Sequence, residues 1–350
     1  MHAPSSDPVF PSEPSPLPYR PALHRFACFC AGSILFLICL GGLVTSHEAG
    51  MSVPDWPNTY GYNMFLFPWH NWVGGIFWEH SHRLVASGVG VLVVILAVGL
   101  YFQERIWLRW MGVIVPVFIA LEGIIGGLRV VLSEDQLGIL HGCLAQLLLV
   151  GVSLIALFTS RWWIGADSPA ARPAAIPRQW TGRLMAVCGL IFFQLLLGAI
   201  MRHEHAGLSI HDFPLAYGQV WPNTDPASIG QYNLARVARN EPTTTALYIN
   251  MQMAHRIGAV LVTAAILAAA AALWLTPGAA PILRRWSAVW VLLVLLQFAL
   301  GAVTIWTNKA ADVATTHVAV GALILVLGAL LAAMSWRLQS QAELTTREVA

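Results

Sequence analysis

Eight separate stretches of about 20 mostly apolar residues run through this 350-residue chain, and a helix needs that length to cross the hydrocarbon core of a bilayer. The apolar runs are continuous rather than alternating, which favours helices over a membrane barrel. We therefore predict an all-α integral membrane protein with eight transmembrane helices. The predicted spans are residues 25–45, 72–100, 111–130, 139–160, 183–201, 252–274, 286–307 and 315–336.

The composition excludes most other classes of protein. Charged residues make up 10% of the chain and hydrophobic residues 57%, whereas a soluble domain carries about 25% charged residues. A soluble enzyme, a disordered protein and a nucleic-acid-binding protein are therefore excluded. The net charge of +2 gives no reason to expect a polyanion, so the expected surroundings are membrane lipid and no nucleic acid.

Arginine and lysine set the predicted orientation. With the N-terminus inside, 12 of these residues fall in cytoplasmic segments and 5 in outer segments, which satisfies the positive-inside rule. Both termini are therefore predicted to be cytoplasmic. The Pro- and Ser-rich segment 1–24 is predicted to be a disordered tail. It carries acidic residues, which a mitochondrial transit peptide lacks, so a bacterial inner membrane is the expected location.

An internal duplication organises the chain. Residues 49–61 and 206–218 are identical at seven of 13 positions, and later motifs repeat in the same order. The prediction is two tandem four-helix bundles, 25–162 and 183–338, joined by a cytoplasmic linker, 163–182, and followed by a cytoplasmic tail, 339–350. Because each unit has an even number of spans, a pseudo-two-fold axis along the membrane normal should relate the bundles.

Four histidines lie inside or at the mouths of apolar spans, near the predicted outer face. They are His82, His141, His255 and His317, two in each half. An ionisable group within a membrane is costly and marks a functional site by default. Two imidazoles facing each other across a four-helix bundle are a common way to hold a haem iron, whereas a structural zinc would need four ligands together. We predict one bis-histidine haem site per half, pairing His82 with His141 and His255 with His317.

An arginine follows one histidine of each pair. Arg83 comes directly after His82, and Arg256 directly after His255. Each arginine can either reach a haem propionate or extend its charged end to the membrane surface. The sequence leaves both readings open.

The two halves differ in one charge near these sites. Glu79 lies three residues before His82, whereas the corresponding residue before His255 is Gln252. A carboxylate near a haem edge can hold water, move protons or stabilise a developing cation, and an amide does little of this. We therefore predict that the N-terminal site is catalytic and that the C-terminal site is structural or relays electrons. Glu122, midway along the third span, should face the bundle interior as a proton path or a neutral hydrogen-bonded acid.

The chain resembles the haem A synthase family over nearly all of residues 25–338. The resemblance is carried by the eight duplicated spans, the Ala49-Gly50-Met51-Ser52 and Asp55-Trp56-Pro57 segments, the Glu79-His80-Ser81-His82-Arg83 motif, and the paired His141, His255 and His317. The Glu-x-x-His-Arg motif with three further spaced histidines is the most specific of these signals.

The resemblance implies an enzyme that oxidises a ring methyl of haem O to the formyl group of haem A, by successive hydroxylations with water as oxygen source. It implies haem b as cofactor, held by His255 and His317, and haem O as substrate beside Glu79, His82 and His141. Haem O synthase and a terminal oxidase are implied assembly partners, and a homo-oligomer is possible for such a chain.

Two departures from the family pattern stand out, and two other functions stay open. The first outer loop lacks the cysteine pair of some relatives, and Glu122 occupies a position where glutamine is expected. One alternative function is a di-haem electron-transfer protein of the cytochrome b or quinol type. The other is a haem transporter or chaperone.

Overall fold

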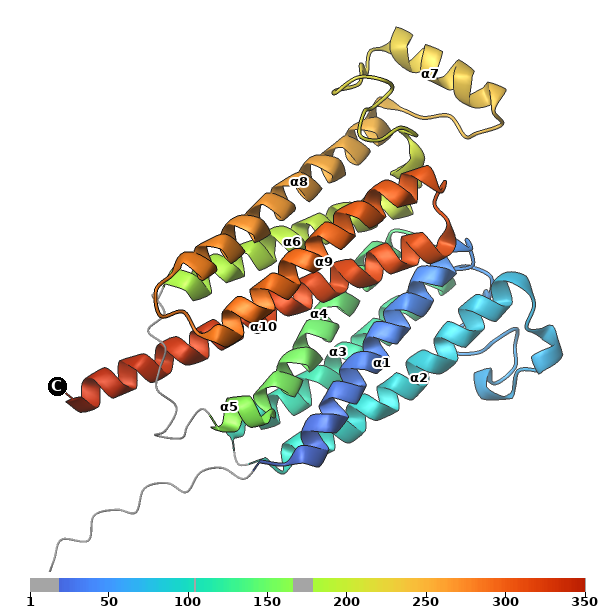
Figure 1. Ribbon diagram of the computed structural model, residues 1–350. Coiled ribbons are helices and arrows are strands. Elements are labelled where there is room, and N and C mark those ends of the chain that lie inside the picture. The colour runs from blue at the N-terminus through green and yellow to red at the C-terminus, as the bar shows by residue number, and fades with distance from the viewer. Residues whose placement is uncertain (1–18, 104, 166–178, 350) are drawn as a thin grey trace, which may run out of the picture.

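The computed structural model describes residues 19–103, 105–165 and 179–349 (Figure 1). No strand occurs in these ranges. The eight long helices are α1 Pro21–Ser46, α2 Gly74–Tyr101, α3 Ile106–Val131, α4 Leu137–Phe158, α6 Gln179–His203, α8 Ala246–Leu275, α9 Pro281–Trp306 and α10 Ala311–Val349. Two shorter helices are α5 Arg161–Gly165 and α7 Pro226–Ala238, and three single turns are Met64–Leu66, Trp69–Asn71 and Ala206–Leu208.

The predicted all-α membrane class is confirmed. All eight long helices are apolar and long enough to cross a membrane, and each contains one predicted span to within two residues at either end. Six of these helices begin four to six residues before their predicted spans, and α10 also ends 13 residues beyond its span. Helix α1 starts at Pro21, where a proline fits because the first turn of a helix leaves its N–H groups unpaired. Helix α10 continues to Val349, through the predicted C-terminal tail. The predicted N-terminal tail as far as residue 18, and residues 166–178 of the predicted linker, lie outside the described residues.

The long helices contact one another in two rings. In the first ring α1 and α3 each contact both α2 and α4, so α2 and α4 are diagonal to each other. In the second ring α6 and α9 each contact both α8 and α10, which are diagonal in the same way. The rings meet where α10 packs against α1 and α4, and α4 against α6 (Figure 1). The pseudo-two-fold axis between them stays a prediction.

Each ring has its own apolar core, and the exposed apolar side chains face outward as a lipid environment requires. The first core is centred on fully buried aliphatic side chains such as Val152 and Ile155. The second includes Leu184 and Trp290. The indole N–H of Trp290 donates to the carbonyl oxygen of Ile324 over 2.9 Å, so this large buried side chain leaves no polar atom unpaired.

The longer connections gather at one end of the molecule, which we call the loop end. It carries residues 47–73, 132–136, 204–245 and 307–310, whereas α1 begins and α10 ends at the opposite end (Figure 1). Since α2, α4, α8 and α10 all start at the loop end, the first turns of these four helices lie at the same end of the molecule.

The two repeated segments at the loop end fold in the same way. The carboxylate oxygens of Asp55 accept hydrogen bonds from the backbone N–H groups five and six residues later, over 2.7 and 2.8 Å. Asp212 makes the same two bonds over the same distances. The sixth residue is Gly61 in one copy and Gly218 in the other, with φ of 78° and 74°, a conformation that favours glycine. The identities between the copies therefore specify one loop structure.

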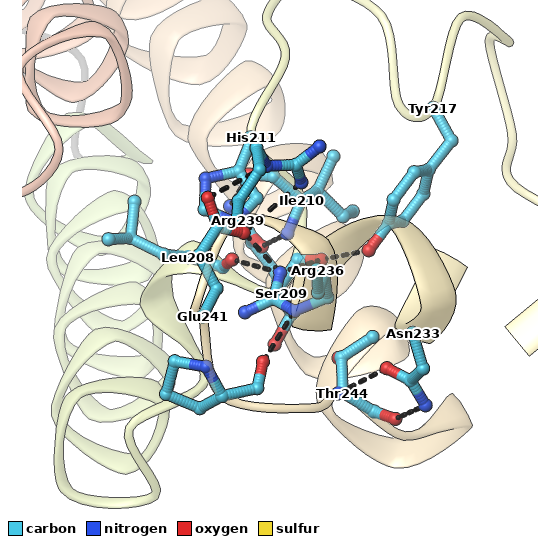
Figure 2. A network of polar contacts seen from close by, with 12 residues as sticks. Leu208, Ser209, Ile210, His211, Tyr217, Asn233, Arg236, Arg239, Glu241 and Thr244 are labelled. Atoms are coloured by element: carbon cyan, nitrogen blue, oxygen red, sulfur yellow. Dashed lines mark hydrogen bonds and ion pairs between the residues drawn. The ribbon is translucent and has the colours of Figure 1, made fainter. Parts of the chain in front are cut away.

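The second long loop carries α7 and is held by a buried arginine. Arg236 donates through Nε to the carbonyl oxygen of Pro242 over 2.6 Å and through Nη1 to that of Leu208 over 2.9 Å. Nη1 also lies 2.8 Å from Nε2 of His211. Figure 2 shows Arg236 at the centre of this network. The guanidinium satisfies several backbone carbonyls of this segment at once, and Ile229 and Tyr232 of α7 pack against a small apolar cluster centred on Ile210.

Candidate functional site

The four predicted histidines all lie at the loop end, each within the first ten residues of its helix. His82 is on α2 and His141 on α4, which are diagonal in the first ring, and His255 on α8 and His317 on α10, which are diagonal in the second. The ring centroids of His82 and His141 are 6.5 Å apart, with their planes at 88°. The chain fold therefore brings together two imidazoles that are 59 positions apart in sequence.

A glycine on a neighbouring helix makes room for every one of these imidazoles. A Cβ atom added at the glycine would lie 3.0 to 3.3 Å from the histidine Cε1, which is tighter than nearly all real contacts. The four pairs are Gly41 with His82, Gly126 with His141, Gly198 with His255 and Gly301 with His317. A close approach of helix backbone to a functional ring is a use of glycine that no other residue can supply.

A carboxylate contacts one histidine of the N-terminal pair. Oε2 of Glu122, on α3, lies 2.6 Å from Nδ1 of His141, and the side chains are 7% and 30% exposed. The prediction that Glu122 faces the bundle interior is confirmed. Its partner is a candidate iron ligand, which the sequence did not reveal.

Two amides contact the histidines of the C-terminal half, and one of them, Gln297, is at the position equivalent to Glu122. Nε2 of Gln194, on α6, lies 3.1 Å from Nδ1 of His255 and donates to the backbone carbonyl of the same residue over 2.8 Å. Nε2 of Gln297, on α9, lies 3.4 Å from Nε2 of His317. Sequence reasoning missed both glutamines, although a polar residue within an apolar span was the signal that could have found them.

Glu79 is buried and fastens the first long loop to α2. Its Oε2 accepts the backbone N–H of Val53 over 2.9 Å, and its Oε1 pairs with Nη2 of Arg83 at 2.6 Å. Arg83 also donates to the carbonyl oxygens of Val53, Asp55 and Asn58 over 2.7 to 3.1 Å. Four of the five guanidinium donors are thus used within the chain, so Arg83 does not extend freely towards the membrane surface.

In the C-terminal half, a neutral side chain holds the second long loop to α8 in the same way. Gln252 both accepts the backbone N–H of Ile210 over 2.7 Å and donates to its carbonyl oxygen over 3.1 Å. Arg256 donates to the carbonyl oxygens of Leu215 and Asp212 over 2.9 and 2.7 Å. Its Nε is buried and has no hydrogen-bond partner among the described residues. Arg256 therefore keeps more free donors than Arg83.

Polar residues also link the two halves at the loop end. His203, the last residue of α6, lies 3.7 Å from the Asp135 carboxylate between α3 and α4. Asp135 pairs with Arg129 as well. Burial raises the pKa of Asp135, but the hydrogen bond and charge of Arg129 outweigh it and hold that pKa below its ordinary value. The ionised form of the Asp135 carboxylate is therefore favoured by its contact with Arg129.

The residues present fit haem groups held from two sides. The donors are imidazoles on diagonal helices of four-helix rings, as haem requires. Nδ1 of His82 and Nδ1 of His317 are buried with no hydrogen-bond partner in the described part of the chain. No cluster of three or more His, Cys, Asp or Glu side chains able to hold a metal ion occurs in the described ranges. The site thus offers ligand pairs rather than a four-ligand cage.

Known proteins match this chain over most of its length. The model of the COX15-CtaA family, described as cytochrome oxidase assembly protein, matches residues 70–329. A haem A synthase of Rhizobium etli (strain CIAT 652) is 27% identical over 91% of this chain and 90% of its own length. A haem A synthase of Rhizorhabdus wittichii is 26% identical over 93% and 95%, and one of Halalkalibacterium halodurans is 28% identical over 62% and 71%.

The family match covers six of the eight long helices in full and α10 as far as residue 329, together with all four histidines and Glu79. This multi-pass membrane protein therefore belongs to the COX15-CtaA family of cytochrome oxidase assembly proteins.

Proposed function

We propose that this protein is a haem A synthase, which oxidises a ring methyl of haem O to the formyl group of haem A. The names of its full-length relatives support this. The observation that carries the proposal is an asymmetry between two otherwise matched histidine pairs. Carboxylates accompany only the N-terminal pair, as Glu79 and Glu122, and their counterparts are the amides Gln252 and Gln297.

In this proposal His82 and His141 bind the substrate, haem O. Its long apolar tail enters sideways from the lipid, between the exposed apolar faces of the helices. Conversion of a methyl to a formyl group takes up one water and releases four protons and four electrons. Glu79 accepts protons or stabilises positive charge that develops near the reacting edge. Its Oε1 contacts Nη2 of Arg83 at 2.6 Å, which fixes the position of the carboxylate beside the first long loop.

His255 and His317 hold haem b in the C-terminal half. When bound there, haem supplies one-electron transfer. Gln194 and Gln297 orient the two imidazoles, and the free donors of Arg256 are suited to a propionate. Arg83 has only one N–H group that is not used in these contacts. In this proposal its main role is to hold the first long loop over the substrate.

The loop end is the proposed outer face of a bacterial inner membrane, with both termini in the cytoplasm. This orientation rests on the distribution of arginine and lysine. Haem O arrives from haem O synthase, and haem A leaves for a terminal oxidase during its assembly. Assembly into a homo-oligomer belongs to the same proposal.

Extraction and chromatography of the haems from the purified protein test this function. Haem O together with hydroxylated intermediates or haem A is the expected result. Two equivalents of haem b alone would instead identify a di-haem electron-transfer protein. Weakly bound, exchangeable haem with no modified product would identify a transporter.

A matched pair of variants tests the role of Glu79. Glu79→Gln keeps an acceptor for the Val53 N–H but removes the charge, and it should stop or stall formyl formation while haem b stays bound. Gln252→Ala should leave the modified haems present, because it lies in the half without the reaction. Haem A formation at the normal rate in Glu79→Gln would show that the carboxylate charge has no catalytic role.

A further inference from the structure

Glu122 is a buried acid that the proposed reaction does not use. It lies on α3, at a position surrounded by apolar residues, and its side chain is 7% exposed. Its Oε2 is 2.6 Å from Nδ1 of His141, and both carboxylate oxygens and that Nδ1 are buried with no other partner among the described residues. An ionisable group within an apolar span is costly and marks a functional position, and the contact of Glu122 is with the His141 imidazole.

The equivalent position in the C-terminal half carries an amide. Glu122 and Gln297 each lie four residues before the glycine, Gly126 or Gly301, that makes room for the histidine. Gln297 meets the other ring nitrogen of His317, Nε2, at the longer distance of 3.4 Å. The two halves thus offer matched histidines with an acidic neighbour in one and a neutral neighbour in the other.

A carboxylate beside a ligand histidine changes that ligand. A carboxylate in contact with Nδ1 favours the tautomer that carries its proton on Nδ1 and leaves Nε2 free to bind iron, and its negative charge makes the imidazole a stronger electron donor. A stronger donor stabilises ferric over ferrous iron, and hydrogen bonding to the ligands is one of the ways a protein sets a haem potential. An amide gives a weaker effect because it is neutral.

We propose that Glu122 is a positioning residue that acts through His141 and lowers the midpoint potential of a haem bound by His82 and His141. The couple is ferric haem plus one electron giving ferrous haem. With Gln297 in place of the acid, the haem of the C-terminal half has the higher potential. Electrons from the N-terminal half then pass downhill to the C-terminal half. This inference rests on the proposed function, because it requires a haem in each half.

A spectroelectrochemical titration of the purified full-length protein tests the inference. The N-terminal site is filled beforehand by adding iron protoporphyrin IX as the probe until its absorbance change saturates. Wild type should give two one-electron waves, and His141→Ala should remove the lower one. Glu122→Gln should raise the midpoint potential of the lower wave only, and Glu122→Asp should restore most of the wild-type potential. Gln297→Glu should lower only the higher wave, which a purely structural role for these residues would not do.

The possible failures are distinguishable. If both midpoint potentials stay unchanged in Glu122→Gln and in Gln297→Glu, the inference is wrong. The proposed function is unaffected by that result. If Glu122→Gln does not take up haem, Gln297→Glu decides alone, and an unmoved higher wave overturns the inference. A single wave in wild type that His141→Ala does not change would overturn the N-terminal haem site and the inference with it.

Discussion

Nη2 of Arg202, on α6, donates a hydrogen bond of 2.6 Å to the carbonyl oxygen of Gly42, on α1. The same atom lies 2.7 Å from Oγ of Ser46. Gly42 in turn packs against Thr315, two residues before His317, and its neighbour Gly41 packs against His82. Arg202 therefore joins the two halves next to Gly41, which contacts His82, and next to Thr315, which lies two residues before His317.

Arg202→Met should weaken the contact between the two helix rings. It keeps most of the side-chain volume but removes two hydrogen bonds, which are worth about 1 to 2 kcal/mol together in a membrane setting. Thermal unfolding in detergent should show a lower midpoint and a lower free energy of unfolding. The matched control is Arg239→Met, since Arg239 is 52% exposed and pairs only with Glu241 in the described contacts, and it should change little. Equal effects of both variants would contradict the bridging role of Arg202.

Gly198→Ala should impair haem binding in the C-terminal half. The new methyl would lie 3.0 Å from Cε1 of His255, and Gln194 restrains the ring from moving away. Overpacking of this kind costs about 1 to 3 kcal/mol, so haem affinity should fall about fivefold to 150-fold, since ~1.4 kcal/mol is a factor of ten. The measurement is the ratio of haem to protein after purification.

Gly189→Ala is the matched control on the same helix. No atom lies within 4 Å of the added methyl, and alanine favours a helix over glycine by about 0.5 to 1 kcal/mol. The control should keep its haem and unfold at a slightly higher temperature. Haem loss in both variants would show that the helix, rather than the space beside His255, limits binding.

Asp55→Ala should loosen the first repeated loop and leave the second unchanged. The variant loses two hydrogen bonds from backbone N–H groups, and their exposure limits the loss to about 1 kcal/mol. Amide hydrogen exchange at Tyr60 and Gly61 should become about fivefold faster, since 1.4 kcal/mol is a factor of ten. Asp212→Ala should have the same effect on its own loop only. Faster exchange in both loops from either variant would contradict the independence of the two copies.

The helices and the four histidines were predictable from sequence because their signals are local. Apolar runs of bilayer length mark the spans, and His82, His141, His255 and His317 interrupt those runs at matching places. The internal repeat also predicted which histidines form pairs, because each half carries two of them at equivalent positions.

The contacts between helices were not predictable in the same way. Arg202 and Gly42 are 160 residues apart, and no pattern along either helix indicates which neighbour it will meet. The sequence also left two alternatives for Arg83, a contact with a haem propionate or extension to the membrane surface. The choice depends on the loop that folds over the guanidinium, and the sequence does not show how that loop folds. Helix α10 extends beyond its predicted end. Hydropathy marks where a helix leaves the lipid, but a helix with polar residues can continue outside it.

The loop around α7 should open as the pH falls. Burial lowers the pKa of His211, and the charges of Arg236 and Arg239 lower it further, against the opposing effects of Glu241 and Asp212. The hydrogen bond from Arg239 holds the pKa of Glu241 below its ordinary value. The closed loop therefore prefers a neutral His211 beside an ionised Glu241 and binds fewer protons than the open loop. Its stability is fully present above the ordinary histidine pKa of about 6.5 and is lost as the pH drops below it.

Amide hydrogen exchange of α7 between pH 8 and pH 5, corrected for the intrinsic pH dependence of exchange, measures this opening. Protection in wild type should fall through this range, first because His211 gains a proton facing Nη1 of Arg236 at 2.8 Å. In His211→Asn the fall should disappear over this whole range, because the lowered pKa of Glu241 keeps its carboxylate ionised until the pH drops below the ordinary glutamate pKa of about 4.3. Unchanged protection of wild-type α7 across the whole range would show that His211 does not couple this loop to pH.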